Sequence, residues 1–323
     1  MSARPVATVV IATYNRPHLV HRAVRSALSQ SVPDIEVIVV DDGSDEPIRP
    51  LTSDRRLRIH RLDRHNGANP ARNLGLAEAR GRWITFLDDD DELLPNMIGA
   101  SLEAAGRSTL PPPISVLSVV EVLGEDGTIL ERRLPVSLPL GSHYSLEPPP
   151  PGRSFLTQNT LLTPREVLER LGGWDEDIGA WDHDDLFLRL NAATSFQGTD
   201  VATYRMHDHA GPRQHRNLIV SADSIRKTLD KHRAIFRHHR RRRAGMTGAA
   251  GIYYLRGGLW GPAFAETSKA LLLNPASPKL YAWWAASVLG PRLSLPLVRT
   301  ARRLNAFIGR PRDGSEEEDR PLP

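Results

Sequence analysis

Apolar and polar positions alternate in blocks over the first part of the chain. Residues 6–12 form a continuous apolar run that is typical of a strand buried in a parallel sheet. Further strands are expected at residues 35–40, 57–62 and 83–87. Between them, apolar residues recur at helical spacing. These helical stretches begin near Pro17, Asn69 and Pro95. Alternating strands and helices predict an α/β fold with a mostly parallel sheet flanked by helices.

Polar clusters follow three of these four expected strands directly. They are Thr13-Tyr14-Asn15, Asp41-Asp42 and the four aspartates Asp88, Asp89, Asp90 and Asp91. In open parallel sheets, ligands bind beyond the carboxyl ends of the strands, so the three clusters predict a single site. Asn15 is also a candidate cap for the helix that begins near Pro17.

The pattern changes after residue 113. A strand is expected at 114–123, a hairpin turn at Asp126-Gly127, and a returning strand at 128–134. Residues 155–163 read as extended, 164–171 and 182–191 as helices, and 196–206 as the last strand. From about residue 218 the pattern is helical, and residues 263–273 and 277–289 predict a helical hairpin. We therefore expect an α/β domain at 1–215, an all-helical C-terminal region at 216–310, and a disordered acidic tail at 311–323.

Composition excludes several classes of protein. The 323 residues include no cysteine, which excludes a disulfide scaffold, a cysteine nucleophile, thiolate-bound zinc and iron–sulfur clusters. Hydrophobic residues make up 40% of the chain, enough for a sizeable core. No signal peptide is visible, and no apolar run reaches the roughly 20 residues of a spanning helix. The expected location is the cytoplasm.

The basic residues are concentrated in one run, from Arg237 to Arg243, although the net charge of the chain is only +4. A solvated helix face is one interpretation of this run. Contact with anionic lipid head groups is the second, which would place the protein peripherally at the inner face of a membrane. Nucleic-acid binding is the weakest interpretation, because it rests on this run alone.

The acidic run after the fourth strand indicates a metal site. Hard divalent cations such as Mg²⁺ and Mn²⁺ prefer oxygen ligands, commonly one or two carboxylates plus substrate phosphates. In an extended segment, Asp88 and Asp90 point to one side and can chelate together, while Asp89 and Asp91 point to the other. The alternative is a solvated acidic loop that caps the next helix.

Ordered motifs along the chain resemble those of the family 2 glycosyltransferases, which have the GT-A fold. The similar segments are IATYNR at 11–16, VVDDGS at 39–44, NG at 66–67 with ARNLG at 71–75, FLDDDD at 86–91, GGWDE at 172–176, DLFLRL at 185–190 and YRMH at 204–207. The resemblance covers about residues 6–210. It implies a GT-A, Rossmann-like sheet and an inverting, divalent-metal-dependent transferase that moves a sugar from a nucleotide-sugar donor to a hydroxyl acceptor.

The resemblance also implies a donor site. Tyr14 and Asp42 would hold the nucleobase, with Ala12 lining the pocket and Asp41 shaping the turn, and Arg72 would approach the nucleotide. In the D-x-D segment, Asp90 would contact the Mn²⁺ or Mg²⁺, Asp88 the ribose or a metal-bound water, and Asp89 would lie on the donor side. His207 would reach the metal or the diphosphate, unless it is simply a surface histidine. UDP- or dTDP-sugars are favoured as donors over GDP-sugars.

The expected catalytic base is where this sequence departs from the family pattern. The acceptor hydroxyl needs a base within hydrogen-bond reach, and the family uses an aspartate. An ungapped alignment places His183 at that position, with Asp182 and Asp184 on either side. We favour the two aspartates together over His183, although Asp182 could equally be a helix cap.

Aromatic and amide side chains are candidates for the acceptor side, namely Asn159, Trp174 and Trp181. Tryptophan faces suit sugar rings, but core packing explains Trp174 equally well. Two other functions remain open. A catalytically inactive nucleotide- or sugar-binding protein is suggested by His183 at the base position. A sugar nucleotidyltransferase would need a Gly-rich basic loop after the first strand, and residues 13–17 do not form one.

Overall fold

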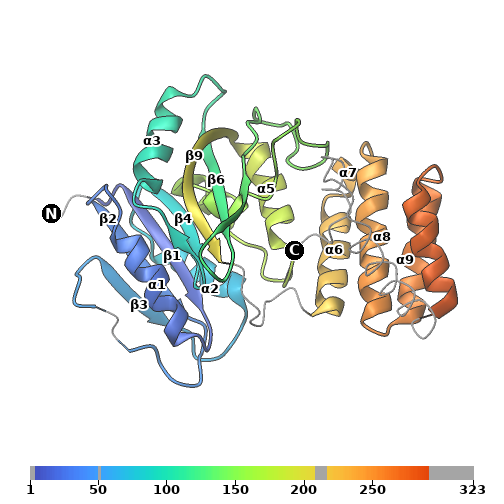
Figure 1. Ribbon diagram of the computed structural model, residues 1–323, viewed down its shortest axis with the longest axis horizontal. Coiled ribbons are helices and arrows are strands. Elements are labelled where there is room, and N and C mark those ends of the chain that lie inside the picture. The colour runs from blue at the N-terminus through green and yellow to red at the C-terminus, as the bar shows by residue number, and fades with distance from the viewer. Residues whose placement is uncertain (1–3, 50–51, 208–216, 291–323) are drawn as a thin grey trace. The chain divides into compact units, whose positions relative to one another are not determined.

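The computed structural model describes residues 4–49, 52–207 and 217–290. The chain forms two compact units: the first comprises Met1–Glu176 and Leu186–Gly211, and the second comprises Asp177–Asp185 and Pro212–Pro323 (Figure 1). The predicted domain boundary at residue 215 stays a prediction. The two compact units differ from it in one respect, because residues 177–185 belong to the second unit together with the C-terminal residues. The predicted disordered tail lies outside the described residues.

The first unit is built on a five-stranded sheet with the strand order β3-β2-β1-β4-β8. Its strands are β1 (Ala7–Thr13), β2 (Ile35–Asp41), β3 (Leu57–Arg61), β4 (Trp83–Asp88) and β8 (Thr163–Pro164). β1 pairs in parallel with β2 and β4, β2 pairs in parallel with β3, and β8 is antiparallel to β4. This confirms the predicted α/β class and its mostly parallel sheet.

Helices cover both faces of this sheet because the central strands are apolar on both sides. Val9 and Ile11 of β1 face a core with α1 and α3, while Val10 faces the opposite core with α2, α4 and α5. These helices are α1 (Pro17–Leu28), α3 (Met97–Arg107), α2 (Ala68–Glu78), α4 (Arg165–Arg170) and α5 (Asp182–Ala193).

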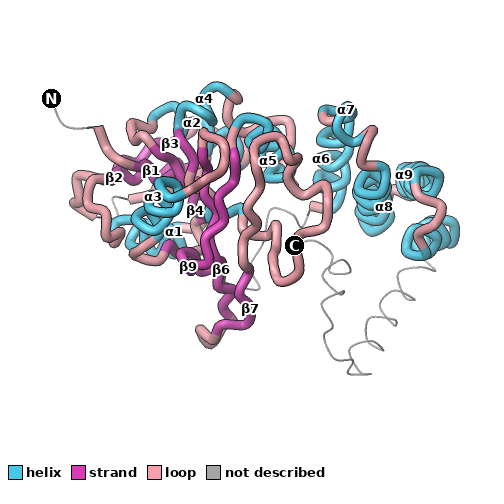
Figure 2. Tube along the Cα trace, turned by 90° about the horizontal axis from the view of Figure 1, so that it is seen from above, coloured by secondary structure: helices cyan, strands magenta, loops and turns pink. Residues whose placement is uncertain are grey.

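A second sheet of the first unit has the strand order β5-β9-β6-β7. Its strands are β5 (Glu92–Leu93), β6 (Ile114–Leu123), β7 (Ile129–Arg133) and β9 (Ser195–His207). β6 and β7 form the predicted antiparallel hairpin, which protrudes from the unit in Figure 2. β9 pairs with both β5 and β6, so it brings its last residue, His207, beside the segment that follows β4.

Two local predictions are wrong. Asn15 does not cap α1: Arg16 is the N-cap residue, and the Asn15 side chain exchanges hydrogen bonds with Asp45 instead. Residues 155–163 are not continuously extended, because a short 3-10 helix, η1 (Gln158–Thr160), interrupts them. In both places a local turn outweighs the preference that the isolated residues suggest.

The described part of the second unit is helical from residue 218 to residue 290, as predicted. Its helices are α6 (Leu218–Lys231), α7 (Arg233–Phe236), α8 (Arg240–Arg256) and α9 (Trp260–Leu273), and residues 278–290 form a further helix. α9 and this last helix pack together through Trp260, whose indole nitrogen donates a hydrogen bond to the Ser287 carbonyl, which confirms the predicted helical hairpin. Within the described ranges, no helix is both long enough and apolar enough to span a bilayer.

Candidate active site

Three strand ends meet at one edge of the five-stranded sheet. Because β1 lies between β2 and β4 in parallel register, Thr13 is paired with Asp41 and Ala12 with Asp88. β2 and β3 follow on one side of β1, and β4 lies on its other side, so the strand order reverses between β1 and β4. Open α/β sheets bind ligands at such a point. The structure thus brings together the polar clusters that the sequence placed at a single site.

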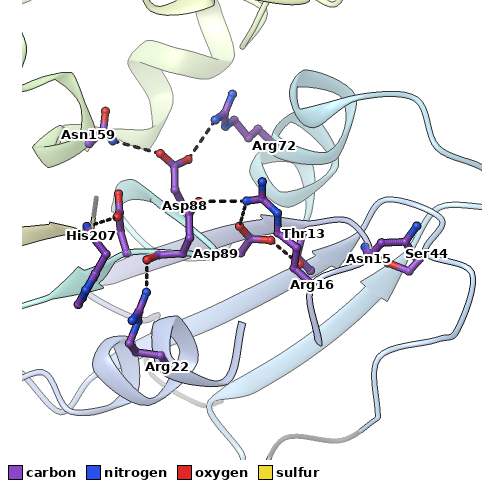
Figure 3. A network of polar contacts seen from close by, with 12 residues as sticks. Thr13, Asn15, Arg16, Arg22, Ser44, Arg72, Asp88, Asp89, Asn159 and His207 are labelled. Atoms are coloured by element: carbon purple, nitrogen blue, oxygen red, sulfur yellow. Dashed lines mark hydrogen bonds and ion pairs between the residues drawn. The ribbon is translucent and has the colours of Figure 1, made fainter. Parts of the chain in front are cut away.

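Arg16 and Thr13 hold the acidic run from the side of β1 (Figure 3). The Thr13 hydroxyl donates a hydrogen bond to Asp89 over 2.7 Å. The Arg16 guanidinium lies 3.0 Å from both the Asp89 and the Asp90 carboxylates. Burial raises the pKa of Asp89 to about 6, although the contacts with Thr13 and Arg16 favour its charged form. Arg16 therefore offsets the repulsion between two adjacent carboxylates.

The predicted alternation of the four aspartates is wrong. β4 ends at Asp88, and Asp89 and Asp90 form a turn rather than extended chain. The turn is closed by a hydrogen bond from the Asp91 amide to the Asp88 carbonyl. Asp88 and Asp90 consequently use different partners instead of sharing one face of a strand.

Asp88 faces Arg72 and Asn159. Its carboxylate lies 3.2 Å from the Arg72 guanidinium and 3.1 Å from the Asn159 amide nitrogen, and its side chain is 39% exposed. The Arg72 guanidinium stacks over the Trp174 ring at 4.6 Å, and this stacking fixes its direction. Asp88 is thus an oriented carboxylate that solvent and ligands can reach.

Asp91 is the buried anchor of the run. It accepts hydrogen bonds from the Tyr204 hydroxyl at 2.8 Å and from the His207 amide at 2.9 Å. Burial, reinforced by the negative charges of Asp88 and Asp90, raises the pKa of Asp91 well above its ordinary value. The His207 ring lies 2.7 Å from the Glu92 carboxylate. These bonds tie the acidic turn to the end of β9.

The two aspartates at the end of β2 shape the neighbouring loops. Asp41 accepts hydrogen bonds from the Ser44 amide and from Arg61, and these bonds hold the turn after β2. Asp42 accepts hydrogen bonds from the Asn66 and Gly67 amides at 2.9 and 2.8 Å. Asp42 therefore fixes the loop that leads into α2.

His65 links the loop before α2 to Asp42 and Tyr14. It lies 2.7 Å from Asp42, and its ring stacks on Tyr14 with centroids 3.8 Å apart. Tyr14 and His65 thus form an aromatic pair at the exposed edge of β1 and β2, next to the half-buried Ala12. A planar base has an aromatic surface to stack on here.

The three candidate bases belong to the second unit. The His183 ring nitrogen Nδ1 lies 3.1 Å from Asp182, whose carboxylate also accepts a hydrogen bond from the His183 amide. Burial raises the pKa of Asp184, and the positive charge of Arg242 offsets part of this rise. Asp185, which follows them, is buried and lies 2.8 Å from His232.

The acceptor candidates have different surroundings. Asn159 contacts Asp88, as described above. Trp174 is only 4% exposed and packs edge-on against Phe86, which favours the packing interpretation of this residue. Trp181, in the second unit, has a left-handed backbone with φ of 58° and lies against Tyr253 at 6.1 Å.

Sequence reasoning missed three residues of the site: Arg16, His65 and Tyr204. Arg16 and Tyr204 lie inside motifs that we quoted, so a search for the counter-charges and donors that four carboxylates require could have found them. His65 precedes the Asn66-Gly67 motif, and only the folded loop brings it onto Tyr14.

The donor atoms of this site suit a hard divalent cation, because they are carboxylate oxygens. Among the residues that the structure describes, no group of three or more His, Asp or Glu side chains is arranged to hold a metal ion.

Part of the first unit is similar to known proteins. Residues 8–135 match the family described as Glycosyl transferase family 2. The succinoglycan biosynthesis protein ExoO of Rhizobium meliloti (strain 1021) is 39% identical over 123 residues, which are 37% of this chain and 35% of the relative. The GalNAc(5)-diNAcBac-PP-undecaprenol beta-1,3-glucosyltransferase of Campylobacter jejuni is 34% identical over 109 residues, 32% of this chain and 35% of the relative. The chain thus spans about a third of the length of these two relatives.

Solved structures extend the likeness beyond the matched residues. The crystal structure of S. aureus TarS 1-349 in complex with UDP-GlcNAc superposes with a TM-score of 0.62 and 16% identity, covering 91% of this chain and 92% of that chain. At that identity the likeness concerns the fold alone. Residues 8–135 are therefore a glycosyltransferase family 2 domain, and the chain has the GT-A fold.

Proposed function

We propose that this protein is an inverting glycosyltransferase that moves a sugar from a nucleotide-sugar donor to a hydroxyl acceptor. The observation that carries the proposal is the convergence of Tyr14, Asp42, Arg72 and the acidic turn at one edge of the sheet, within or beside the family-matched residues. This edge offers an aromatic surface for a base, a cation for a phosphate and carboxylates for a metal ion.

The donor is proposed to be a UDP- or dTDP-sugar. The similar TarS structures were solved with UDP-GlcNAc and with UDP, which supports a uridine nucleotide here. The base would stack on the pair of Tyr14 and His65, and Arg72 would contact the phosphates. Arg72 already forms an ion pair with Asp88, so its guanidinium would contact the phosphates and the Asp88 carboxylate at the same time.

Asp88 and Asp90 would hold a divalent cation, Mn²⁺ or Mg²⁺, together with diphosphate oxygens. Two carboxylates plus phosphates are a common arrangement for such ions. When bound, the cation would supply positive charge that stabilises the departing nucleoside diphosphate. Arg16 would have to release Asp90 to make room, and it would keep Asp89 as its partner. His207 is bonded to Glu92, so it could join the cation only after leaving that carboxylate.

A base from the segment of Asp182, His183 and Asp184 would take the proton of the acceptor hydroxyl. The hydroxyl oxygen then bonds to the anomeric carbon from the face opposite the diphosphate. The bond between that carbon and the diphosphate oxygen breaks, and its electron pair leaves with the nucleoside diphosphate. Asp184 is suited to this role because a raised pKa makes a carboxylate a better proton acceptor near neutral pH. His183 held by Asp182 is the alternative.

The acceptor is proposed to be a growing glycan or a lipid-linked sugar. The names of the two relatives, one in succinoglycan biosynthesis and one acting on an undecaprenol-linked oligosaccharide, support this class. An inactive nucleotide-binding protein is the second candidate, because a histidine stands where the family has its aspartate base.

Calorimetric titration tests the donor site directly. UDP, dTDP and GDP are titrated into the full chain with and without Mn²⁺, using the wild type, Asp90→Ala, and Asp63→Ala as an exposed aspartate control. We expect one uridine or thymidine nucleotide to bind only with metal, and Asp90→Ala alone to lose it. If no nucleotide binds with any metal, the proposed site is wrong.

Turnover measurements distinguish an active transferase from an inactive binding protein, and they identify which residue is the catalytic base. With the nucleotide identified, release of nucleoside diphosphate is followed for Asp182→Asn, His183→Ala and Asp184→Asn. Loss of turnover with unchanged nucleotide affinity identifies the base. Binding without turnover on any sugar donor would favour the inactive protein, and retention of the anomeric configuration in the product would refute the inverting mechanism.

A further inference from the structure

The charge of this chain is divided very unevenly along its length. Residues 231–312 contain 16 lysines and arginines and a single acidic residue, Glu266, which gives this segment a net charge of +15. The whole chain has a net charge of only +4, so the remaining residues carry −11. The described part of this segment, residues 231–290, belongs to the second unit and has ten lysines and arginines against that one glutamate. The described aspartates of the same unit lie outside the segment, in residues 177–185 and 217–230. A segment with this excess of cations suits an anionic partner.

The basic residues of α8 lie at its positively polarised end. α8 begins with four arginines, Arg240 to Arg243, and has no acidic residue in its first turn. Positive side chains at a helix N-terminus interact unfavourably with the helix dipole. Arg240 and Arg241 are exposed. Since the fold tolerates this arrangement, an anion at this end would relieve a repulsion that the isolated protein carries.

Exposed apolar side chains lie at this same end of the unit. Ala244, one turn into α8, packs with Ala270 of α9 and with Leu280 of the last helix. The start of α8, the end of α9 and the start of the last helix are therefore neighbours, and Figure 1 shows α8 and α9 side by side. Close to this cluster, Leu272 is 78% exposed and Tyr281 is 50% exposed.

Two lysines complete this surface. Lys269, on α9, is exposed and lies 2.8 Å from the Glu266 carboxylate, while Lys279 lies 5.1 Å from the centre of the Trp283 ring. We name the combined surface the basic end and define it by Arg240, Arg241, Lys269, Leu272, Lys279 and Tyr281. Of these residues, four are cationic, and the other two are an apolar side chain and an aromatic side chain with a polar tip.

We propose that the basic end docks on the surface of an anionic lipid bilayer. Lipid head groups would neutralise the arginines and lysines, while Leu272 and Tyr281 enter the boundary between head groups and acyl chains. Tyrosine is enriched at that depth because one end of its side chain is apolar and the other is wet. A nucleic acid would satisfy the cations but would leave the exposed leucine in water, so the apolar residues favour the bilayer.

This proposal does not depend on the proposed catalytic activity, because binding to vesicles is measured directly. The full chain is sedimented with vesicles of phosphatidylcholine alone and with vesicles that also contain phosphatidylglycerol. We expect binding to the mixed vesicles only. Each basic residue at such a surface strengthens binding by about fivefold, and raising the salt concentration weakens it.

Two double variants test the two parts of the surface. Arg240→Glu with Arg241→Glu should weaken binding by more than about twentyfold, because it removes two favourable charges and adds two unfavourable ones. Arg25→Glu with Arg107→Glu, at exposed sites of the first unit, makes the same change in net charge and should weaken it much less.

Leu272→Gln with Tyr281→Gln should weaken binding by about tenfold through the loss of apolar burial. Ile129→Gln with Leu130→Gln, at exposed positions of the β6–β7 hairpin, is the control and should bind like the wild type. Circular dichroism confirms that each variant remains folded.

Several outcomes would overturn the proposal. Equal binding to both kinds of vesicle would remove the anionic specificity. Loss of binding in the arginine variant but full binding in the Leu272 and Tyr281 variant would indicate a purely electrostatic surface, as for a nucleic acid. A change of oligomeric state in the Leu272 and Tyr281 variant, seen by size-exclusion chromatography, would show that a second copy of the chain covers this end.

Discussion

Replacing Arg16 by methionine tests how the acidic turn is held together. In the wild type, one guanidinium lies 3.0 Å from the carboxylates of both Asp89 and Asp90, whose side chains are only 7% and 16% exposed. Methionine keeps much of the packing volume but leaves two adjacent, mostly buried carboxylates without that cation. Removing one partner of a buried ion pair costs about 3–5 kcal/mol. Arg16 itself is 25% exposed, so we expect the lower value, about 3 kcal/mol at pH 7.5.

The cost should depend on pH and on a second substitution. At pH 5, Asp89 can take up a proton instead of remaining charged, so Arg16→Met should cost about half as much. Asp90→Asn in the Arg16→Met background removes the like charge and should recover about 1 kcal/mol. Mn²⁺ should also stabilise the Arg16→Met variant more than the wild type, because a cation can replace the guanidinium.

Urea unfolding curves at the two pH values measure these free energies. Arg25→Met, at an exposed position in the last turn of the same helix, is the matched control and should change stability by less than about 0.5 kcal/mol. An Arg16→Met variant as stable as this control would refute the role that we assign to Arg16. Failure of Asp90→Asn to restore stability would refute the repulsion between the two carboxylates.

Three further predictions concern the first unit. Gly81→Ala should destabilise the first unit by several kcal/mol through overpacking, because the added Cβ would lie 2.5 Å from the Thr8 backbone nitrogen. Thermal unfolding measures this loss of stability. Gly106→Ala, whose Cβ would meet no atom within 4 Å, should instead stabilise α3 by about 0.5–1 kcal/mol in the same assay, and a loss of stability would contradict the open surroundings. The raised pKa of Asp89 means that the folded protein holds a proton there that the unfolded chain releases, so stability should fall by at most about 3 kcal/mol as the pH rises from 3.8 to about 6. Asp89→Asn should flatten this slope in urea unfolding at pH 4 and pH 7, and an unchanged slope would assign it to other groups.

Local patterns in the sequence were sufficient to predict the framework of the fold. The apolar runs at 6–12, 35–40 and 83–87 became β1, β2 and β4, because an extended segment that is apolar on both faces is stable only inside a covered parallel sheet. The same patterns placed the polar clusters at one edge, since parallel neighbours end on the same side. The family resemblance rested on motifs within these elements, and the comparisons confirm it.

The partners of the site residues could not be predicted in this way. A period-two alternation assigned Asp88 and Asp90 to one face, but β4 ends at Asp88, and the turn that follows sends the two carboxylates to Arg72 and to Arg16. Those arginines lie 16 and 74 residues away along the chain. Such pairings depend on which segments the sheet brings together, and no local period encodes them.

The sequence by itself therefore determined the central strands, the helices that cover them, the sheet edge where the polar clusters meet, and the family resemblance, because each of these depends on residues close together in the chain. It also determined the uneven charge, which is a matter of counting. Only the tertiary structure decided that Arg16 bridges Asp89 and Asp90, that His65 stacks on Tyr14, and that Leu272, near the end of α9, is exposed. Charge pairing, ring stacking and apolar exposure are properties of distances in space, and the fold sets those distances.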